Sequence, residues 1–226
     1  MTTRYRMKIL VSWSGGKDCM LALHKAIQTH SPSEVYLLNM CDEDGSMSRS
    51  HGLSALLMQR QAEAMGLHLL QIAVQRDGGG YEASFKKGVA ELMVKGVTHG
   101  VFGDIYLETH RSWVERVCQE CGITPIFPLW GMKSEEVVRS LIDEKFRTTI
   151  VSIRKGKLSP EEFLGKDLSH PLLDTLKVMP GIDPCGENGE YHTFVYDGPL
   201  FQKPLSFRIT GQTENDKHYF NTLQLL

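Results

Sequence analysis

The sequence contains no apolar run long enough to cross a bilayer. Its longest runs, Met7–Trp13 and Ala55–Met58, fall far short of the ~20 residues that a membrane-spanning helix needs. Arg4 and Arg6 lie near the N-terminus, but a strand-like run follows them in place of the apolar core and cleavage site of a signal peptide. We therefore expect a cytoplasmic protein with no membrane partner.

The chain also has little net charge. Its 25 lysines and arginines and 27 aspartates and glutamates leave a formal charge of −2. A protein that binds nucleic-acid backbones usually shows a basic excess or a basic face. Bulk charge therefore argues against nucleic-acid binding, although a local basic face can exist within a balanced total. With 41% hydrophobic and 23% charged residues, the composition is that of an ordinary globular protein with a core.

Cysteine is scarce and odd in number. Five cysteines suit a reducing compartment better than a disulfide framework. Cys118 and Cys121 have the C-x-x-C spacing of redox and zinc sites, but no second such pair and no histidine pair completes a zinc site, and Cys185 stands alone. Since their segment has helical periodicity, we interpret them as two thiols that pack one turn apart in the core. The sequence assigns no metal ligand.

Apolar runs alternate with helical patterns along the first 127 residues. The predicted strands are Lys8–Trp13, Glu34–Met40, Leu67–Val74, His99–Phe102 and Thr124–Phe127. The predicted helices are Cys19–Thr29, His51–Met65, Tyr81–Val94 and Thr109–Cys121. This alternation is typical of βαβ units, so we predict an α/β fold with a parallel, doubly wound sheet. Ligands of such sheets bind beyond the carboxyl ends of the strands, and we expect the fourth strand beside the first.

The pattern changes after Phe127. The predicted elements there are helices at Ser134–Glu144, with Ser134 as N-cap, and from Ser159 onward, and strands at Thr148–Ile153, Tyr191–Tyr196, Pro204–Thr210 and His218–Leu225. We therefore divide the chain into a nucleotide-binding domain, residues 1–130, and a smaller α+β substrate domain, residues 131–226.

The motif Ser14-Gly15-Gly16-Lys17-Asp18 joins the first predicted strand to the first predicted helix. Its glycines allow a tight turn that exposes backbone N–H groups, and the helix that follows adds the positive end of its dipole. Ser14 can donate a hydroxyl to a phosphate oxygen, and Lys17 supplies positive charge. The motif lacks the glycine spacing and final hydroxyl residue of the P-loop, and it is not G-x-G-x-x-G. It predicts a phosphate-binding loop, with an ordinary glycine-rich turn as the alternative.

Two further segments carry polar residues suited to chemistry. Asp104 follows the fourth predicted strand, where an acidic residue can orient a substrate or a metal, although Gly-Asp is also a common turn. Residues 181–193 hold Glu187, Glu190 and His192 in a glycine-rich stretch with little core-forming character. Carboxylates beside a histidine are common tools of proton transfer. The alternative is a solvated loop before a strand.

Two positions near the second strand and second helix are weaker candidates. The acidic run Asp42–Asp44 is interpreted mainly as a solvated loop, although an adenine could meet the backbone near Met40. His51 begins the second predicted helix, where a single histidine is more often a surface or capping residue than a functional one.

The phosphate-loop motif resembles the PP-loop of ATP pyrophosphatases, although Cys19 stands where that family usually has Ser or Thr. Taken with other segments, residues 8–210 are similar to the diphthine–ammonia ligase family. The segments that carry the similarity are Val11–Asp18, Met47–Gly52, Phe102–Ile105, Pro128–Trp130, Cys185–Thr193 and Gly198–Phe201. Cys185–Thr193 is the specific one, because the phosphate loop alone fits many PP-loop enzymes.

This resemblance implies a fold of the PP-loop ATP pyrophosphatase type (adenine nucleotide alpha hydrolase-like), with ATP between the two domains. The implied ATP-binding residues are Ser12, Ser14, Gly15, Gly16, Lys17, Asp18, Met40, His51 and Gly103. The implied catalytic residues are Asp104, Glu187, Glu190 and His192. These four would face the acceptor and ammonia, and Glu190 or His192 would serve as the base for ammonium.

The implied activity is that of an amide ligase. A carboxylate would attack the α-phosphate of ATP to give an acyl-adenylate and pyrophosphate, and ammonia would then displace AMP. The partners would be ATP, ammonia and a carboxylate acceptor, which is diphthine of elongation factor 2 where the organism makes it. Mg²⁺ would assist the departure of pyrophosphate. A homodimer is compatible with the sequence. The alternatives are a PP-loop enzyme that modifies tRNA or another small molecule, and a non-catalytic ATP sensor.

Overall fold

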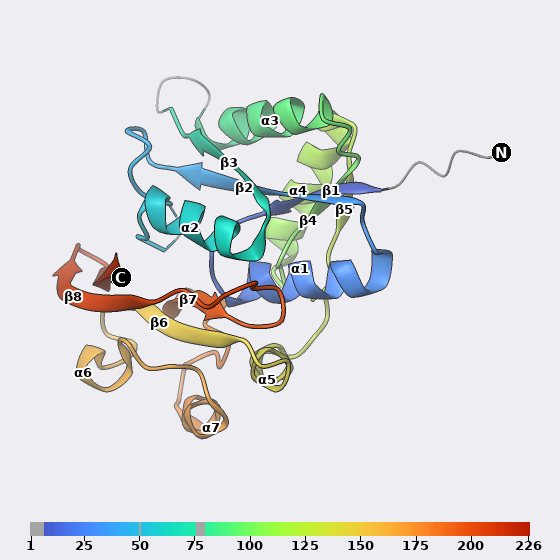
Figure 1. The fold of residues 1–226 in the computed structure, drawn as a ribbon. Coiled ribbons are helices and arrows are strands. Elements are labelled where there is room, and N and C mark those ends of the chain that lie inside the picture. The colour runs from blue at the N-terminus through green and yellow to red at the C-terminus, as the bar shows by residue number, and fades with distance from the viewer. Residues whose placement is uncertain (1–6, 50, 76–79) are drawn as a thin grey trace.

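Five parallel strands form the centre of the structure, a computed structural model that describes residues 7–49, 51–75 and 80–226 (Figure 1). The strands are β1 (Lys8–Ser12), β2 (Glu34–Cys41), β3 (His68–Ala73), β4 (His99–Val101) and β5 (Thr124–Ile126). They lie in the order β3-β2-β1-β4-β5, so β1 pairs with both β2 and β4. This confirms the predicted parallel sheet and the place of the fourth strand beside the first.

Helices cover both faces of this sheet because successive strand residues point to opposite sides. Ile9 and Val11 of β1 belong to the apolar cluster that includes α1 (Lys17–His30) and α2 (Ala55–Met65). Leu10, between them, belongs to a second cluster. That cluster is built with α3 (Gly80–Met93) and α4 (Glu108–Cys121). The carboxyl ends of the strands are left for the loops that build the site.

The second helix begins at Ala55, four residues later than predicted. Ser54 is its N-cap and accepts a hydrogen bond on Oγ from the Leu57 N–H at 3.2 Å. The residues before the cap form antiparallel bridges, one of which joins Met47 to Ser54. The expectation that His51 begins this helix is therefore wrong, and His51 lies in the loop that leads into it.

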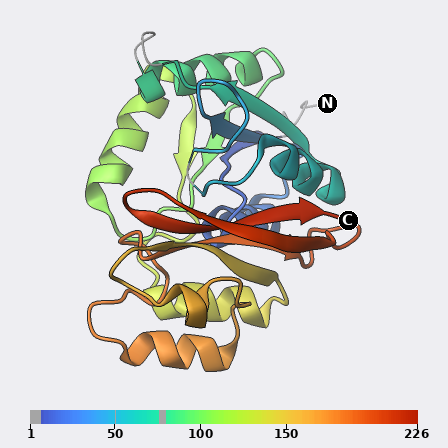
Figure 2. The same ribbon diagram turned by 90° about the vertical axis from the view of Figure 1, so that its left-hand side faces the viewer.

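An antiparallel sheet in the order β7-β6-β9-β8 forms the second part of the chain (Figure 2). Its strands are β6 (Arg147–Arg154), β7 (Tyr191–Asp197), β8 (Phe207–Glu214) and β9 (His218–Leu225). The accompanying helices are α5 (Ser134–Asp143), α6 (Pro160–Phe163) and α7 (His170–Val178). This confirms the expected smaller α+β part.

Three details of this second part differ from the prediction. Lys133, and not Ser134, is the N-cap of α5. Helix α7 was not predicted, and Ser169 caps it by accepting the Leu172 N–H at 3.4 Å. Strand β8 lies later than expected, because its residues are nearly all exposed and pairing with β9, not burial, defines it.

The two parts share one apolar core, which includes residues of α1, α5 and β7. Backbone hydrogen bonds also join them, since the Val195 N–H donates to the Gly15 carbonyl at 3.0 Å. The buried Gln61 Nε2 donates to the Gly15 carbonyl at 3.0 Å and to the Val195 carbonyl at 2.6 Å. Strand β7 thus holds the segment after β1 in place. The division of the chain at residue 130 stays a prediction.

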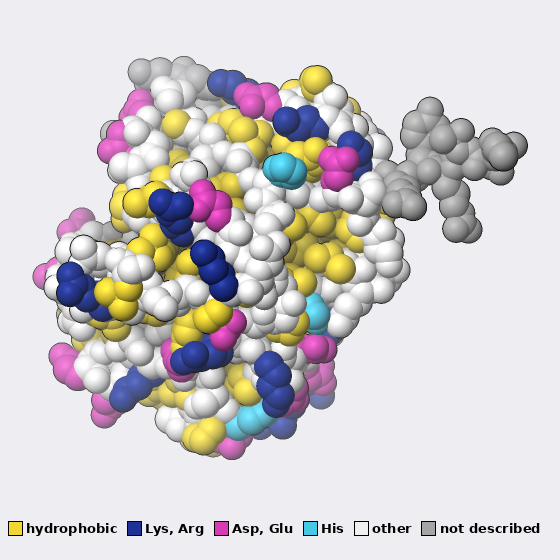
Figure 3. Space-filling model, viewed as in Figure 1, with side chains coloured by type: hydrophobic (Ala, Val, Ile, Leu, Met, Phe, Trp, Pro, Cys, Tyr) yellow, Lys and Arg dark blue, Asp and Glu magenta, His cyan; other side chains and the backbone are white. Residues whose placement is uncertain are grey.

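Charged side chains of both signs are mixed on the face shown in Figure 3. This distribution agrees with the balanced composition of the chain. Within the part of the chain that the structure describes, every helix is too short or too polar to cross a bilayer.

Candidate active site

A pocket of about 270 Å³ lies at the carboxyl ends of β1, β2 and β4. The first part of the chain contributes the segment after β1, the ends of β2 and β4 and the starts of α3 and α4. The second part contributes residues between Gly186 and Thr193. The fold therefore brings together the three segments that the sequence marked as candidates. Ten predicted site residues line the pocket, and the other three are Gly15, Gly16 and Glu190.

The two glycines shape the loop between β1 and α1 from behind the pocket. Gly15 has φ +78°, and a Cβ there would lie 2.7 Å from Cε of Met58. A Cβ on Gly16 would lie 2.4 Å from Cε1 of His51. Both positions therefore favour glycine, and the turn directs the positive end of the α1 dipole at the pocket. Cys19 donates its thiol to the Gly16 carbonyl at 3.2 Å, so it stabilises this turn.

Lys17 is the buried cation of the pocket, with 4% of its surface exposed. Its Nζ lies 2.9 Å from Oδ2 of Asp18 and 5.3 Å from the centre of the Tyr191 ring. Burial by itself would lower the pKa of Lys17, but the charge and hydrogen bond of Asp18 together with Cys185 and Tyr191 outweigh it and raise that pKa well above its usual value. Lys17 therefore keeps its positive charge inside the pocket.

Two carboxyl groups of the pocket have raised pKa values. Burial, together with the negative charges of Asp18 and Asp104, raises the pKa of Glu187 from 4.5 to about 8. Burial also raises the pKa of Asp104, against the influence of His110, whose Nδ1 lies 3.5 Å from Oδ1 of Asp104. A carboxyl that titrates near neutral pH is suited to proton transfer. Glu187 is therefore the strongest acid–base candidate of the site.

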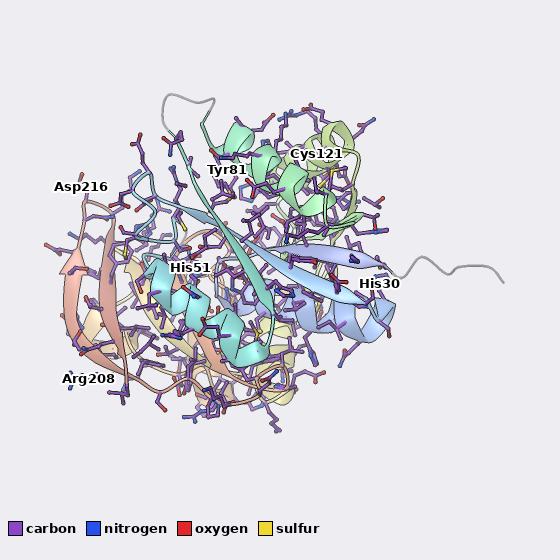
Figure 4. The ribbon with its side chains drawn as sticks, turned by 45° about the horizontal axis from the view of Figure 1, so that its top comes forward. His30, His51, Tyr81, Cys121, Arg208 and Asp216 are labelled. Atoms are coloured by element: carbon purple, nitrogen blue, oxygen red, sulfur yellow. The ribbon has the colours of Figure 1, made fainter. Side chains whose placement is uncertain are left out.

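Two stacked histidines form another wall of the pocket. The rings of His51 and His192 lie 4.8 Å apart, and Figure 4 marks His51 beside the start of α2. Burial, with the charges of Lys17 and His218, lowers the pKa of His192 to about 4. Burial and the neighbouring His192 lower the pKa of His51 well below its usual value. Both rings are therefore neutral at physiological pH and can only be weak bases.

Glu190 lies beneath the loop and does not line the pocket. It is buried, and its carboxylate accepts hydrogen bonds from the N–H groups of Asp183 at 2.9 Å and Asn188 at 3.1 Å. Asp183 in turn accepts the Cys185 N–H at 2.7 Å. This placement favours a role in holding the loop in shape over the predicted contact with ammonia.

Several residues of the site carry no sequence signal that marks them. Tyr81 and His110 line the pocket from α3 and α4, where they are single positions within ordinary helical patterns. Thr193 lies in the glycine-rich motif, but its role is visible only in three dimensions. Its Oγ1 accepts the Lys17 N–H at 3.1 Å and so caps the first turn of α1 from the second part of the chain.

The cysteine pair of α4 is not part of the site. Cys118 is buried and free, and burial raises the pKa of its thiol to about 12. Cys121, one turn later, is free and partly exposed. The interpretation of two buried thiols is confirmed for Cys118, whereas Cys121 is only partly buried and packs against the same apolar cluster. Among residues 7–49, 51–75 and 80–226, no group of three or more His, Cys, Asp or Glu side chains could hold a metal ion.

Comparison with known proteins gives one consistent family. The model of the diphthamide synthase N-terminal domain matches residues 7–125, and that of the diphthamide synthase C-terminal domain matches residues 133–224. The diphthine–ammonia ligase of Homo sapiens is 30% identical over 224 residues, which cover 88% of this chain and 82% of that protein. The diphthine–ammonia ligase of Danio rerio is 30% identical over 228 residues, which cover 90% of this chain and 88% of that protein.

Among solved structures, a "predicted subunit of tRNA methyltransferase" from Methanocaldococcus jannaschii aligns with 85% of this chain and 100% of that chain. The TM-score is 0.40 and the sequence identity 18%, so this likeness carries no argument about function.

Proposed function

Since the chain belongs to the diphthamide synthase family, we propose that it is an ATP-dependent amide ligase that forms AMP and pyrophosphate. Its acceptor would be a carboxylate, that of diphthine on elongation factor 2 where the organism makes it, and ammonia would supply the nitrogen. One observation carries this proposal. The loop at the N-terminus of α1 shares a pocket with Glu187 and His192 from the other end of the chain.

The loop after β1 has what departing pyrophosphate requires. The positive end of the α1 dipole and the buried charge of Lys17 would stabilise the negative charge that develops as the bond between the α- and β-phosphates breaks. Because Lys17 is already paired and buried, it needs little rearrangement when ATP binds. The adenine would lie toward Leu38 and Met40, which give the pocket an apolar wall at the end of β2.

Glu187 would serve as the base that converts ammonium into ammonia. Ammonia attacks only when its nitrogen carries a free electron pair, so the site needs a group that accepts a proton near neutral pH. With a pKa of about 8, Glu187 is a far stronger base than an ordinary carboxylate, and its ionised form, which increases as the pH rises toward 8, would accept this proton. His192, with a pKa of about 4, is too weak a base. We assign His192 to orienting the acceptor or ammonia by hydrogen bonding.

Mg²⁺ would be held mainly by the phosphates of ATP. A magnesium ion at such a site keeps several waters and takes only one or two carboxylates from the protein. Asp18 and Asp104 fit this requirement, since both line the pocket and the charge of Asp18 raises the pKa of Asp104. Bound there, the ion would neutralise the charge of the phosphates. A third protein ligand is not needed, in agreement with the lack of a three-residue cluster among the described residues.

Pyrophosphate exchange tests the proposal. With the acceptor present and ammonium absent, labelled pyrophosphate should enter ATP, because the adenylate forms reversibly. Added ammonium should convert the acceptor into its amide, with AMP and pyrophosphate in equal amounts. Formation of ADP and phosphate would exclude this reaction. ATP binding without pyrophosphate release, whichever acceptor is offered, would favour the sensor alternative.

A further inference from the structure

Asp183 joins three segments of the chain outside the lining of the proposed ATP pocket. Its Oδ2 accepts the hydroxyl of Tyr106 at 2.9 Å and that of Ser134 at 2.7 Å. Tyr106 lies between β4 and α4, Ser134 begins α5, and Asp183 itself lies in the glycine-rich stretch before β7. Neither Tyr106 nor Asp183 is among the described residues that line the pocket. These two side chains can therefore act on the pocket only through residues that do line it.

The other oxygen of Asp183 holds the loop that carries Glu187. Its Oδ1 accepts the N–H of Cys185 at 2.7 Å and, more weakly, that of Glu187 at 3.5 Å. The Gly186 N–H donates to the Asp183 carbonyl at 2.8 Å and closes the turn. The carboxylate thus accepts two hydrogen bonds from its own loop and two from other elements. The backbone from which the Glu187 side chain projects is therefore fixed relative to Asp183.

Tyr106 is anchored to the part of the pocket that carries Asp104. It follows Asp104 by two residues, and both lie in the loop after β4. Ile105, between them, is fully buried, and its carbonyl accepts the Gly131 N–H at 2.8 Å. Because this backbone is short and held on both sides, a movement of Tyr106 would also move Asp104. The hydrogen bond from Tyr106 to Asp183 therefore connects the loop of Asp104 with the loop after Asp183.

The contacts of the same loop with the phosphate-binding loop do not depend on this bond. The thiol of Cys185 donates to Oδ1 of Asp18 at 3.3 Å, while Nζ of Lys17 holds Oδ2 of Asp18 at 2.9 Å. The hydroxyl of the buried Tyr191 donates to the Pro184 carbonyl at 2.6 Å. Loss of the hydrogen bond between the tyrosine after β4 and the aspartate should therefore leave the phosphate-binding loop in place.

We propose that Asp183 is a positioning residue that, through Tyr106, fixes the separation of Asp104 and Glu187. The reaction served by these two carboxyl groups rests on the proposed ligase function, whereas their fixed separation does not. Groups that act on bound reactants must be held closely in place, because a misplacement of about 1 Å can cost about 100-fold in rate. The rival interpretation is that the hydrogen bond between Tyr106 and Asp183 only adds stability to the fold.

Tyr106→Phe tests this proposal, because it removes one hydroxyl and leaves every charged group in place. The side chain is 40% exposed, so the variant should fold. Its kcat for amide formation should fall about 10-fold, whereas the KM for ATP should change by less than about two-fold. Tyr196→Phe is the matched control, since the Tyr196 hydroxyl also donates to an aspartate, Asp167, but does not line the pocket. It should retain the wild-type kcat.

Amide hydrogen exchange followed by NMR tests the connection without the reaction. The N–H groups of Cys185 and Glu187 should exchange about 10-fold faster in Tyr106→Phe than in the wild-type protein, and at the wild-type rate in Tyr196→Phe. Asp183→Asn keeps an oxygen for the Cys185 N–H and gains an N–H that can donate to the Tyr106 hydroxyl. It should therefore retain more of the kcat than Asp183→Ala.

Two results would overturn the proposal. An unchanged kcat in Tyr106→Phe would reduce its hydrogen bond to a purely stabilising one. Unchanged exchange at Cys185 and Glu187 would show that Tyr106 does not hold their loop. Measurement of AMP formation separates this proposal from the ligase function. If the wild-type protein forms no AMP with any acceptor, but exchange in Tyr106→Phe is faster as expected, the ligase function fails and the fixed separation stands.

Discussion

Replacement of Glu187 by glutamine should stabilise the free protein and prevent amide formation. Glutamine has nearly the same shape as glutamate but carries no charge. In the folded protein, burial and the charges of Asp18 and Asp104 oppose the ionisation of Glu187. In the unfolded chain that carboxyl ionises freely, so the wild-type protein loses folding free energy as the pH rises.

The size of this loss in folding free energy, and the pH range over which it develops, follow from the pKa values of Glu187 in the folded and unfolded states. Below pH 4.5 the Glu187 carboxyl is protonated in both states, and it adds no penalty. Between pH 4.5 and its folded pKa of about 8, the unfolded state is ionised and the folded state is not. The penalty therefore grows by ~1.4 kcal/mol for each pH unit. At pH 7 this amounts to ~3 kcal/mol, and we expect about half of it, because solvent screens a partly buried side chain.

Urea unfolding of both proteins between pH 4.5 and pH 8 measures this effect. The difference in unfolding free energy should be near zero at pH 4.5 and should favour Glu187→Gln increasingly toward pH 8. Glu162→Gln, at an exposed position of α6, is the matched control and should leave the stability unchanged at every pH. Amide formation by Glu187→Gln should fall at least 100-fold, in the range that loss of a general base produces.

Either of two outcomes would refute this reasoning. A stability difference that does not depend on pH would show that Glu187 is not forced to keep its proton. Full amide formation by Glu187→Gln would remove Glu187 as the base for ammonium, whatever its pKa.

Three further substitutions test the phosphate-binding loop after β1 and the buried carboxylate beneath the pocket. Lys17→Ala should weaken ATP binding at least 10-fold by calorimetry, since it removes a buried charge-assisted contact, whereas Lys25→Ala on the same helix should not. Gly16→Ala should also weaken ATP binding, because its methyl group would lie 2.4 Å from Cε1 of His51 and displace the loop; unchanged affinity would contradict this account. Glu190→Gln should lower the unfolding free energy by ~1–3 kcal/mol in urea titrations, because loop N–H groups lose a charged acceptor.

The central sheet was predictable because its strands are short apolar runs separated by amphipathic helices. Buried parallel strands such as β1 require such runs, and glycine at the end of α2 and α4 marks where those helices stop. The start of α2 was not predictable from periodicity, since an antiparallel bridge of Met47 to Ser54 holds the residues before Ala55 in an extended loop. Strand β8 was shifted for a similar reason, because an exposed strand has no apolar pattern.

The site likewise combines features that the sequence predicts with features that only the fold reveals. The loop Ser14–Asp18 could be placed from sequence, because its glycines and its position between a strand and a helix have a local physical reason. The capping of α1 by Thr193 could not, since 176 residues separate the two partners. Glu190 illustrates the opposite error: its residue type suggested chemistry, but only the fold reveals that backbone N–H groups surround its carboxylate. Tyr106 and Asp183, 77 residues apart in the sequence, meet only in the folded chain.

The central claim, that the acceptor carboxylate is adenylated, can be tested by following an oxygen atom. The acceptor carboxylate is labelled with ¹⁸O and incubated with the protein, ATP, Mg²⁺ and ammonium, and the nucleotide product is examined by mass spectrometry. Attack of that carboxylate on the α-phosphate predicts one ¹⁸O atom in AMP for each amide formed. Unlabelled AMP, or ¹⁸O in inorganic phosphate accompanied by ADP, would contradict the account.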